Sequence, residues 1–195
     1  MQTDWNEPFT RFAALYEEAK QQQPKDPNAV TLATVDAAGR PSARIVLLKD
    51  FDPRGFVVFT NYQSRKGQEL LGQRFAALCF HWPSLDQQVR VEGRAEKVAA
   101  AESDAYFATR ARASQLGAWA SLQSQPLEDR RRLDKRLADF TAEYQGGPVP
   151  RPSHWGGFRI AADRIEFWKA RENRLHERTL YEKQGEGWSA SALYP

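Results

Sequence analysis

The chain has 195 residues, of which 41% are hydrophobic, and its formal net charge is +3. That length buries a sizeable core and fits one domain, or one domain with an appended helix. Because Cys79 is the only cysteine, the composition excludes disulfides and cysteine-based metal sites. No apolar run is long enough to span a membrane, and no basic-then-apolar leader opens the chain, so we expect a soluble, cytoplasmic protein.

The first predicted element is a helix within residues 1–24. Its apolar residues, among them Phe9, Phe12 and Tyr16, recur at near-helical spacing before the stretch Gln21–Pro24 ends the pattern. We expect this helix to pack on the outside of a single domain formed by residues 25–195.

From residue 29 the pattern becomes that of short strands separated by turns. Strands over 30–35 and 41–49 predict a hairpin, and Asp52–Gly55 has the composition of a type I turn. The next predicted elements are a strand over 55–60, a short helix over 66–73, and strands over 75–82 and 87–98.

Residues 101–145 are helical in character and form an insertion between two sets of strands. A loop rich in Pro and Gly follows at 146–153. Four more strands are predicted, over 155–161, 165–169, 175–182 and 188–194. Strands, then helices, then strands again predict an α+β fold, mainly antiparallel β, in which a barrel carries peripheral helices.

Two clusters of donors indicate a phosphate site. Arg44 and Lys49 stand at the ends of four apolar residues, as suits a buried strand, and Ser64 is a candidate helix N-cap followed by Arg65 and Lys66. Amides at a helix start, together with Arg and Lys, bind phosphate. Cations that flank a strand are also typical of solvated strand ends, and for either cluster alone that structural role is the more common one.

A second anion site is indicated within the helical insertion. Tyr106 and Arg110 are four residues apart and share a helix face, and Ser114 follows them. A phosphate dianion accepts hydrogen bonds from these three donor types. Residues 117–124 add amide and hydroxyl donors, a pattern that is also common at an ordinary helix end.

A third polar group lies near the C-terminus. Strand alternation would place Arg174, His176 and Arg178 on one face, with Trp168 as an aromatic wall for a planar ring. An exposed strand face balanced by neighbouring glutamates is the alternative. The chain shows no pattern typical of a metal site or a hydrolytic triad. Phosphate sites without a nucleophile indicate that a cofactor carries the difficult chemistry.

Seven segments share the order and spacing of one known pattern, from about Asp26 to Pro195. They are Arg44–Lys49, Thr60–Lys66, Gln88–Gly93, Gln115–Trp119, Trp155–Arg159, Ile165–Trp168 and Arg174–Arg178. Together they resemble the pyridoxine/pyridoxamine 5′-phosphate oxidase family. The resemblance implies an FMN-binding split β-barrel and a homodimer with the flavin at the subunit interface.

The resemblance also implies a reaction in vitamin B6 salvage. Pyridoxamine 5′-phosphate or pyridoxine 5′-phosphate would be oxidised to pyridoxal 5′-phosphate by hydride transfer from the 4′ carbon to flavin, with O2 reduced to H2O2. The family's flavin contacts correspond to Arg44, Ile45, Val46, Leu47, Leu48, Lys49, Phe59, Thr60, Arg65, Lys66, Gln88, Gln123, Ser124, Trp168 and Arg178. Its substrate contacts correspond to Lys49, Tyr106, Arg110, Ser114, Arg174, Leu175 and His176. We expect Arg174 and His176 to orient the ring and support its charge during catalysis.

The chain departs from the family pattern at three places. Phe59 stands where a tyrosine is frequent, and Gln87 stands where an arginine is common. Many members also carry an N-terminal segment with an Arg-x-x-Tyr-like motif that closes over the site, and this chain begins after the position of that motif. We therefore expect lid closure and substrate retention to differ from those members.

Arg44 and Lys49 are five residues apart, so a regular strand would aim them at opposite faces. Either a bulge intervenes or the two cations serve different pockets, and the resemblance favours the second. Three alternative functions remain: a flavin reductase-like split-barrel protein, a non-catalytic pyridoxal phosphate-binding protein, and a nucleic-acid-binding barrel. The joint presence of Tyr106, Arg110 and Ser114 argues against the reductase, and we expect neither a nucleic-acid nor a membrane partner.

Overall fold

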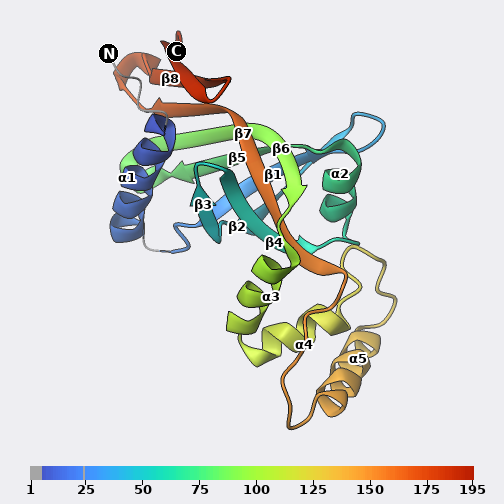
Figure 1. Cartoon of the computed structure of the whole chain (residues 1–195). Coiled ribbons are helices and arrows are strands. Elements are labelled where there is room, and N and C mark those ends of the chain that lie inside the picture. Colours follow the sequence, from blue (N-terminus) through green and yellow to red (C-terminus); the bar gives the residue numbers. More distant parts are fainter. Residues whose placement is uncertain (1–5, 24) are drawn as a thin grey trace.

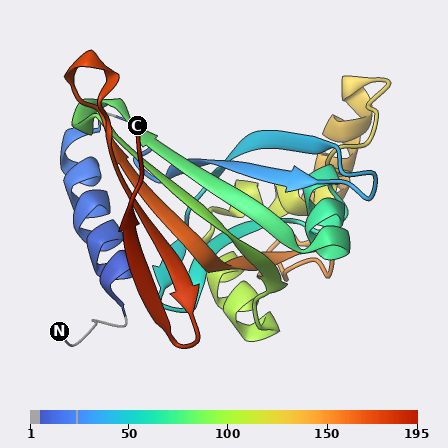
Figure 2. The same cartoon turned by 90° about the horizontal axis from the view of Figure 1, so that it is seen from above.

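The computed structural model describes residues 6–23 and 25–195. Within them the strands form one nine-stranded sheet, antiparallel throughout, which curls into a half-barrel (Figures 1 and 2). The predicted class, mainly antiparallel β with peripheral helices, is confirmed. The helices are α1 (Glu7–Gln22), α2 (Arg65–Gln73), α3 (Ala100–Thr109), α4 (Arg112–Ala120) and α5 (Arg130–Glu143). The strands are β1 (Ala29–Val35), β2 (Pro41–Leu47), β3 (Asp50–Asp52), β4 (Gly55–Asn61), β5 (Phe75–Trp82), β6 (Gln87–Lys97), β7 (Trp155–Lys169), β8 (Glu177–Gln184) and β9 (Gly187–Ala192).

Strand β7 is the centre of the sheet. The strand order is β2-β1-β5-β6-β7-β4-β3, and β8 and β9 extend from β7 outside this path. The first half of β7 pairs with β4, its second half pairs with β8, and β6 runs along both halves. Lys49 donates its backbone N–H to the carbonyl of Val57 at 2.9 Å, which brings the end of β2 back to β4. The curl of the half-barrel follows from these two relationships.

A β-bulge joins two segments that the sequence pattern predicts as separate strands, 155–161 and 165–169. The register between β6 and β7 shifts between Glu92 and Gly93, so that Asp163 is the extra residue. A Cβ at Gly93 would collide with the backbone carbonyl of Ala161, so only glycine permits this close approach. The segment 162–164 is therefore a bend within one strand and not a turn between two.

The core lies between the sheet and α1. Phe12 on α1 is fully buried and meets Phe51, Phe56 and Phe80 edge to face, with ring centroids 4.8–5.0 Å apart. Strand β1 shows the expected alternation, with Val30 and Leu32 buried. The predicted N-terminal unit, residues 1–24, contains residues 1–5 and 24, which lie outside the described residues. Its described part is the amphipathic helix that closes this side of the sheet.

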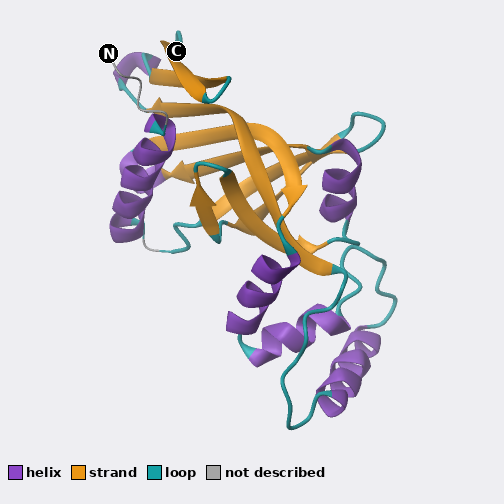
Figure 3. Ribbon diagram, in the orientation of Figure 1, coloured by secondary structure: helices purple, strands orange, loops and turns teal. Residues whose placement is uncertain are grey.

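Helices α3, α4 and α5 gather at one end of β7, whereas β8 and β9 lie at the other end (Figures 1 and 3). Helix α2 covers the far end of β1 and β6 (Figure 1). The longest strand, β7, therefore has the helices α3, α4 and α5 at one end and the strands β8 and β9 at the other. Among the described residues, no helix is long and apolar enough to cross a membrane.

The turn predicted at Asp52–Gly55 is present, because Asp52 pairs with Gly55, and residues 50–52 before it form the short strand β3. One further local prediction is wrong. The predicted strand at 175–182 begins later, at Glu177, because Asn173 and Arg174 adopt positive φ values of 55° and 61° that interrupt an extended chain. Strict alternation therefore does not place Arg174, His176 and Arg178 on one strand face.

Candidate active site

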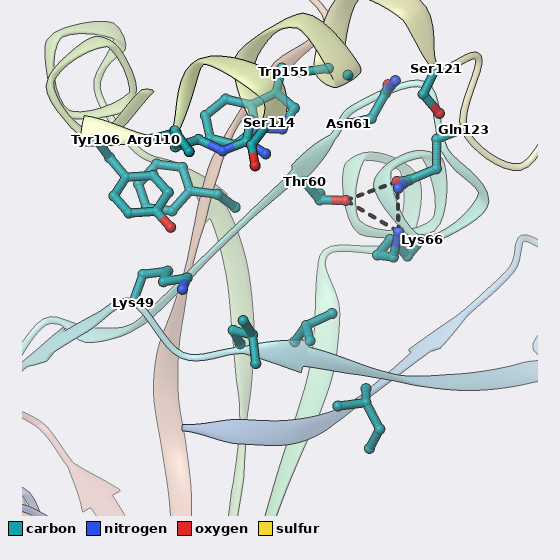
Figure 4. Close-up of a pocket in the computed structure, with 17 residues that line it drawn as sticks. Lys49, Thr60, Asn61, Lys66, Tyr106, Arg110, Ser114, Ser121, Gln123 and Trp155 are labelled. Carbon is teal, nitrogen blue, oxygen red and sulfur yellow. Dashed lines mark hydrogen bonds between the residues drawn. The ribbon is translucent and has the colours of Figure 1, made fainter. Parts of the chain in front are cut away.

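A cavity of about 670 Å³ opens between the half-barrel and the helices α3 and α4. Its walls come from β2 and the residues after it, the end of β4, the start of α2, α3, α4 and the start of β7. Figure 4 shows side chains from these elements facing one space. The residues that line it are Ile45, Val46, Leu47, Lys49, Phe59, Thr60, Asn61, Lys66, Tyr106, Arg110, Ala111, Ser114, Gly117, Ala118, Ser121, Gln123 and Trp155.

One end of the cavity is built around the ammonium of Lys66. It donates to Gln123 Oε1 at 2.9 Å and to Thr60 Oγ1 at 3.2 Å, and Thr60 also donates to Gln123 at 3.4 Å (Figure 4). Burial lowers the pKa of Lys66, and the positive charge of Arg44 lowers it further. A cation that is both desolvated and close to another cation favours a bound anion. This end is therefore suited to a phosphate group.

The start of α2 holds Lys66 in place. Ser64 caps the helix, because its hydroxyl accepts a hydrogen bond from the Gly67 N–H at 3.2 Å. A Cβ at Gly67 would lie 2.5 Å from the backbone oxygens of Asn61 and Tyr62, so the helix begins in close contact with the end of β4. The predicted N-cap is thus present, and it directs the N-terminus of α2 toward the cavity.

Two of the predicted flavin-phosphate cations meet at a buried carboxylate beside this end. Glu69 on α2 accepts a hydrogen bond from Arg65 Nε at 2.9 Å and one from Arg44 Nη2 at 3.3 Å. Thr34 and Ser42 donate to the same carboxylate. Burial alone would raise the pKa of Glu69, but these hydrogen bonds outweigh it and hold the pKa at about 2. Glu69 is therefore ionised at neutral pH.

The other end of the cavity is a layered aromatic wall. The rings of Phe59 and Tyr106 stack with centroids 4.1 Å apart, and Phe59 stacks on Trp155 at 5.4 Å. The Lys49 ammonium lies 5.9 Å from the centroid of the Tyr106 ring, and the Arg110 guanidinium lies 4.6 Å from that of Trp155. Two cations thus flank the aromatic layer on the side of the cavity (Figure 4).

Arg110 carries an unused donor. Its Nη1 atom is buried and has no hydrogen-bond partner within the described part of the chain. Burial lowers the pKa of Arg110, although the nearby Tyr106 acts in the opposite direction. A buried guanidinium nitrogen without a partner is costly unless a ligand supplies an acceptor. Because Arg110 also lines the cavity, its guanidinium is a candidate donor to an anion at the end opposite Lys66.

Polar contacts fix helix α3 to β7 and to the loop before it, which sets the position of Tyr106 and Arg110. The Gly157 N–H donates to Ser103 Oγ at 3.1 Å, Arg159 pairs with Glu102 at 3.1 Å, and Arg151 pairs with Asp104 at 2.6 Å. Arg159 and Arg151 are only 12% and 15% exposed, so both ion pairs are shielded from solvent on one side.

The remaining predicted residues form a second cluster near the other end of β7. In register, Gln88 on β6 lies opposite Trp168, and Trp168 lies opposite Arg178 on β8. Directly opposed residues of antiparallel strands share a sheet face. The His176 ring lies 4.5 Å from that of Trp168, and its Nδ1 accepts the N–H of Arg171 at 3.2 Å.

A buried glutamate, Glu166, orders this second cluster. It accepts hydrogen bonds from Arg178 at 2.8 and 3.1 Å and also pairs with Arg90. Burial would raise the pKa of Glu166, but the hydrogen bonds from Arg178 and the charge of Arg90 lower it overall. Arg178 also donates to the backbone oxygen of Tyr194 at 3.0 Å, which ties the C-terminal residues to the cluster.

Comparison with known proteins matches almost the whole chain. A family model described as pyridoxamine 5′-phosphate oxidase matches residues 16–144, and one described as the pyridoxine 5′-phosphate oxidase C-terminal dimerisation region matches residues 155–195. The chain belongs to the pyridoxine/pyridoxamine 5′-phosphate oxidase family. A protein of that name from Myxococcus xanthus is 59% identical over 97% of this chain and 92% of its own. Proteins of the same name from Caulobacter vibrioides and Brucella anthropi are 56% and 54% identical, covering 97% and 99% of this chain and 85% and 96% of theirs.

Solved structures agree with this family assignment. The structure of PhzG from Burkholderia lata, in complex with tetrahydrophenazine-1-carboxylic acid, aligns with a TM-score of 0.91 at 32% identity, over 96% of this chain and 92% of that one. A pyridoxamine 5′-phosphate oxidase-related, FMN-binding protein from Nostoc punctiforme aligns with a TM-score of 0.77 at 17% identity, over 96% and 98% of the two chains. The second similarity shows the shared fold alone.

The fold divides the residues predicted from the oxidase family into three groups. Those that line the cavity are Ile45, Val46, Leu47, Lys49, Phe59, Thr60, Lys66, Tyr106, Arg110, Ser114 and Gln123. Those at the other end of the sheet are Gln88, Trp168, Arg174, Leu175, His176 and Arg178. The others are Arg44 and Arg65, which bind Glu69, Ser124 beside Gln123, and Leu48, whose side chain is buried in the core.

Sequence reasoning missed several residues of the oxidase-family site. Trp155 and Asn61 line the cavity, and both lie within segments singled out by the resemblance, although neither was assigned a contact. Glu69 could have been found from its spacing, because it is four residues after Arg65 on a helix. Its contacts with Thr34 and Ser42 depend on a distant hairpin, which no local pattern indicates.

Proposed function

We propose that the protein oxidises pyridoxamine 5′-phosphate and pyridoxine 5′-phosphate to pyridoxal 5′-phosphate, with FMN as hydride acceptor and O2 as final oxidant, which is reduced to H2O2. The family membership supports the substrate class. One structural observation carries the proposal furthest: a single cavity has a set of phosphate donors at each of two ends, with an aromatic wall at one of them. A site for a phosphorylated cofactor and a phosphorylated substrate needs this arrangement.

The donors at the Lys66 end fit the FMN phosphate. Lys66, Thr60 and the N-terminus of α2 face the cavity, and Arg65 stands on the first turn of the same helix. Ile45, Val46 and Leu47 provide an apolar edge for the planar ring, and Ile45 is 64% exposed in the single chain. When bound, FMN accepts a hydride from the substrate and passes its electrons to O2.

The donors at the opposite end fit the substrate phosphate. The guanidinium of Arg110, the ammonium of Lys49 and the hydroxyls of Tyr106 and Ser114 are of the kind that a phosphate dianion accepts hydrogen bonds from. A phosphate held there would leave the pyridine ring within the same cavity as the cofactor. The chain's task is then to hold the 4′ carbon close to its hydride acceptor.

The second cluster would complete the site from another protomer. Strand β7 has 15 residues, roughly 45 Å when fully extended, and it separates the two clusters within one chain. We infer a homodimer in which Arg174, His176 and Arg178 of one protomer reach the cavity of its partner. The match of residues 155–195 to a dimerisation region supports this arrangement. Arg174 and His176 would then orient the pyridine ring and support charge that develops on it.

An absorbance experiment tests the reaction. The purified protein with FMN should be yellow, lose flavin absorbance on anaerobic addition of pyridoxamine 5′-phosphate, and recover it in air with one H2O2 per turnover. Arg174→Ala should slow the bleaching and leave the colour unchanged. A flavin that binds but stays oxidised would favour a reductase-like protein or a carrier of pyridoxal phosphate. No flavin binding would refute the cofactor assignment, and nucleic-acid affinity that falls steeply with salt would favour the third alternative.

A further inference from the structure

Glu69 is buried where no ligand of the proposed reaction needs a negative charge. The residue is 7% exposed and does not line the cavity, and yet it lies one helical turn after Arg65 and three residues after Lys66. A buried carboxylate is costly unless it is paired and fully hydrogen-bonded. Its position beside a predicted anion site therefore calls for a role.

The two carboxylate oxygens of Glu69 have different partners. Oε2 accepts Thr34 Oγ1 at 2.5 Å, Ser42 Oγ at 2.7 Å and Arg44 Nη2 at 3.3 Å, all from the β1–β2 hairpin. Within the described part of the chain, Oε1 accepts a hydrogen bond from the Nε of Arg65 alone, at 2.9 Å. Glu69 thus links the hairpin to the first turn of α2.

The two arginines are held differently. Arg44 directs Nη1 to the Leu32 carbonyl and Thr34, and Nη2 to Ser42 and Glu69, so its guanidinium is committed to the protein. Arg65 uses only Nε, and within the described residues no hydrogen bond engages its two Nη groups. The Arg65 side chain is 61% exposed. A guanidinium anchored through Nε presents both Nη groups in a fixed direction.

The net charge of the side chains around Glu69 balances that of a phosphate dianion. Arg44, Arg65 and Lys66 contribute three positive charges, and Glu69 contributes one negative charge, which leaves two positive charges at the start of α2. Without Glu69, the positive charge of Arg44 would repel that of Lys66 with no negative charge beside it to offset the repulsion.

We propose that Glu69 is a positioning residue for the phosphate of the flavin cofactor, which fixes the direction of the Arg65 guanidinium through its Nε and ties it to the β1–β2 hairpin. The inference rests on the proposed function, because it takes the Lys66 end of the cavity as the FMN phosphate site. Two effects oppose each other when Glu69 is removed. Loss of a nearby negative charge favours an anion, whereas loss of the anchor frees an exposed arginine with many rotamers, and we expect the second effect to dominate.

The test compares FMN with riboflavin, which lacks the phosphate. Both are titrated into the apoprotein by quenching of flavin fluorescence, for the wild type, Glu69→Gln, Glu69→Asp and Arg65→Gln, and for the double variant of Glu69→Gln with Arg65→Gln. Glu69→Asp keeps the charge but is one methylene shorter, so it cannot reach both arginines. Glu17→Gln, which loses an exposed ion pair with Lys20 on α1, is the matched control.

We expect the preference for FMN over riboflavin to fall about tenfold in Glu69→Gln and in Glu69→Asp, with riboflavin affinity unchanged. In the Arg65→Gln background, Glu69→Gln should add no further loss. Equal weakening of both ligands, tighter FMN binding in Glu69→Gln, or additive losses would each overturn the proposal. An effect of Glu69→Gln that Glu69→Asp does not share would also overturn it, since charge and not position would then be responsible.

The same titrations separate the inference from the proposed function. A wild type that binds FMN no better than riboflavin refutes the phosphate site itself, and the role of Glu69 fails with it. A wild type that prefers FMN, with Glu69 variants that prefer it equally, leaves the proposed function standing and refutes only the positioning role. Unchanged riboflavin affinity reports that each variant is folded around its site.

Discussion

Trp155 and Trp168 lie near opposite ends of one strand, β7, and each belongs to a different cluster of polar residues. Trp155 stacks in the aromatic wall and carries the guanidinium of Arg110 over its ring, whereas Trp168 contacts the ring of His176. Because the strand is continuous and bent only at its bulge, the two clusters stand far apart within one chain. Under the proposed function, a complete site therefore requires two chains.

Mixed dimers should restore activity that neither parent has. We expect Lys49→Ala and Arg174→Ala homodimers each to be strongly impaired. Every site in the first lacks the Lys49 ammonium, and every site in the second lacks the Arg174 guanidinium. After the two variants are unfolded and refolded together, half of the dimers are mixed, and each mixed dimer has one intact site of two, so about a quarter of wild-type activity should return. Steady-state oxidation of pyridoxamine 5′-phosphate measures this. No recovery in the mixture would show that both residues act in one protomer's site.

Arg110→Met should separate substrate binding from stability. Removal of a buried, unpaired nitrogen should leave the free energy of unfolding of the apoprotein unchanged or raise it. Loss of a charged hydrogen bond to phosphate should raise KM for pyridoxamine 5′-phosphate roughly ten- to hundredfold. Urea unfolding and steady-state kinetics measure the two effects. Arg130→Gln, an exposed cation on α5, is the control, and an unchanged KM for Arg110→Met would exclude its role at the substrate phosphate.

FMN affinity should weaken at alkaline pH. The pKa of Lys66 lies below its usual 10.5 because the side chain is buried and Arg44 is nearby. Lys66 therefore loses its proton at a lower pH than an ordinary lysine, and the positive charge at the phosphate site is lost with it. FMN titrations from pH 7 to 10 should show a dissociation constant that rises through this pKa. In Lys66→Met the affinity should be weaker at pH 7 and should fall less as the pH rises, whereas identical profiles for the two proteins would contradict the assignment.

Glu69 should contribute to stability above pH 4.5. Its pKa in the folded protein is about 2, below the ordinary 4.5, so the folded state favours the ionised carboxylate. The contribution is fully present above 4.5 and is lost as the pH falls towards 2. Urea unfolding should therefore find Glu69→Gln less stable than the wild type at pH 7, with the two curves converging between pH 4.5 and 2. A constant difference across that range would mean that the carboxylate charge is not responsible.

Gly93→Ala should destabilise the fold more than a typical glycine substitution. A Cβ at this position would overlap the carbonyl of Ala161 in the neighbouring strand. The backbone must shift at the bulge, and we expect a loss of about 2–4 kcal/mol in the free energy of unfolding. Gly72→Ala on α2, where no atom lies within 4 Å of the added Cβ, should be neutral or stabilising. Equal effects in the two variants would show that the bulge tolerates a side chain.

Much of the local structure could be predicted because it depends on neighbours in the chain. The alternation of Val30 and Leu32 specifies a half-buried strand, and Ser64 specifies the start of α2. Tyr106 and Arg110 both line the cavity, as their spacing predicts, although Arg110 caps the end of α3 and is not part of the helix. The family resemblance adds the candidate cavity residues, since a shared order of motifs carries a shared fold.

Tertiary structure decided the arrangements that join distant segments. Asp163 is a bulge and not a turn because the register with β6 continues beyond it and Gly93 leaves room for the close approach. Glu69 meets Thr34 and Ser42 because α2 packs on a hairpin far away in sequence. The two clusters stand at opposite ends of β7 because strand pairing, and not local propensity, sets where each residue lies. Side-chain type and spacing thus determined which donors the chain has, and the long-range registry of the sheet determined which of them can act together.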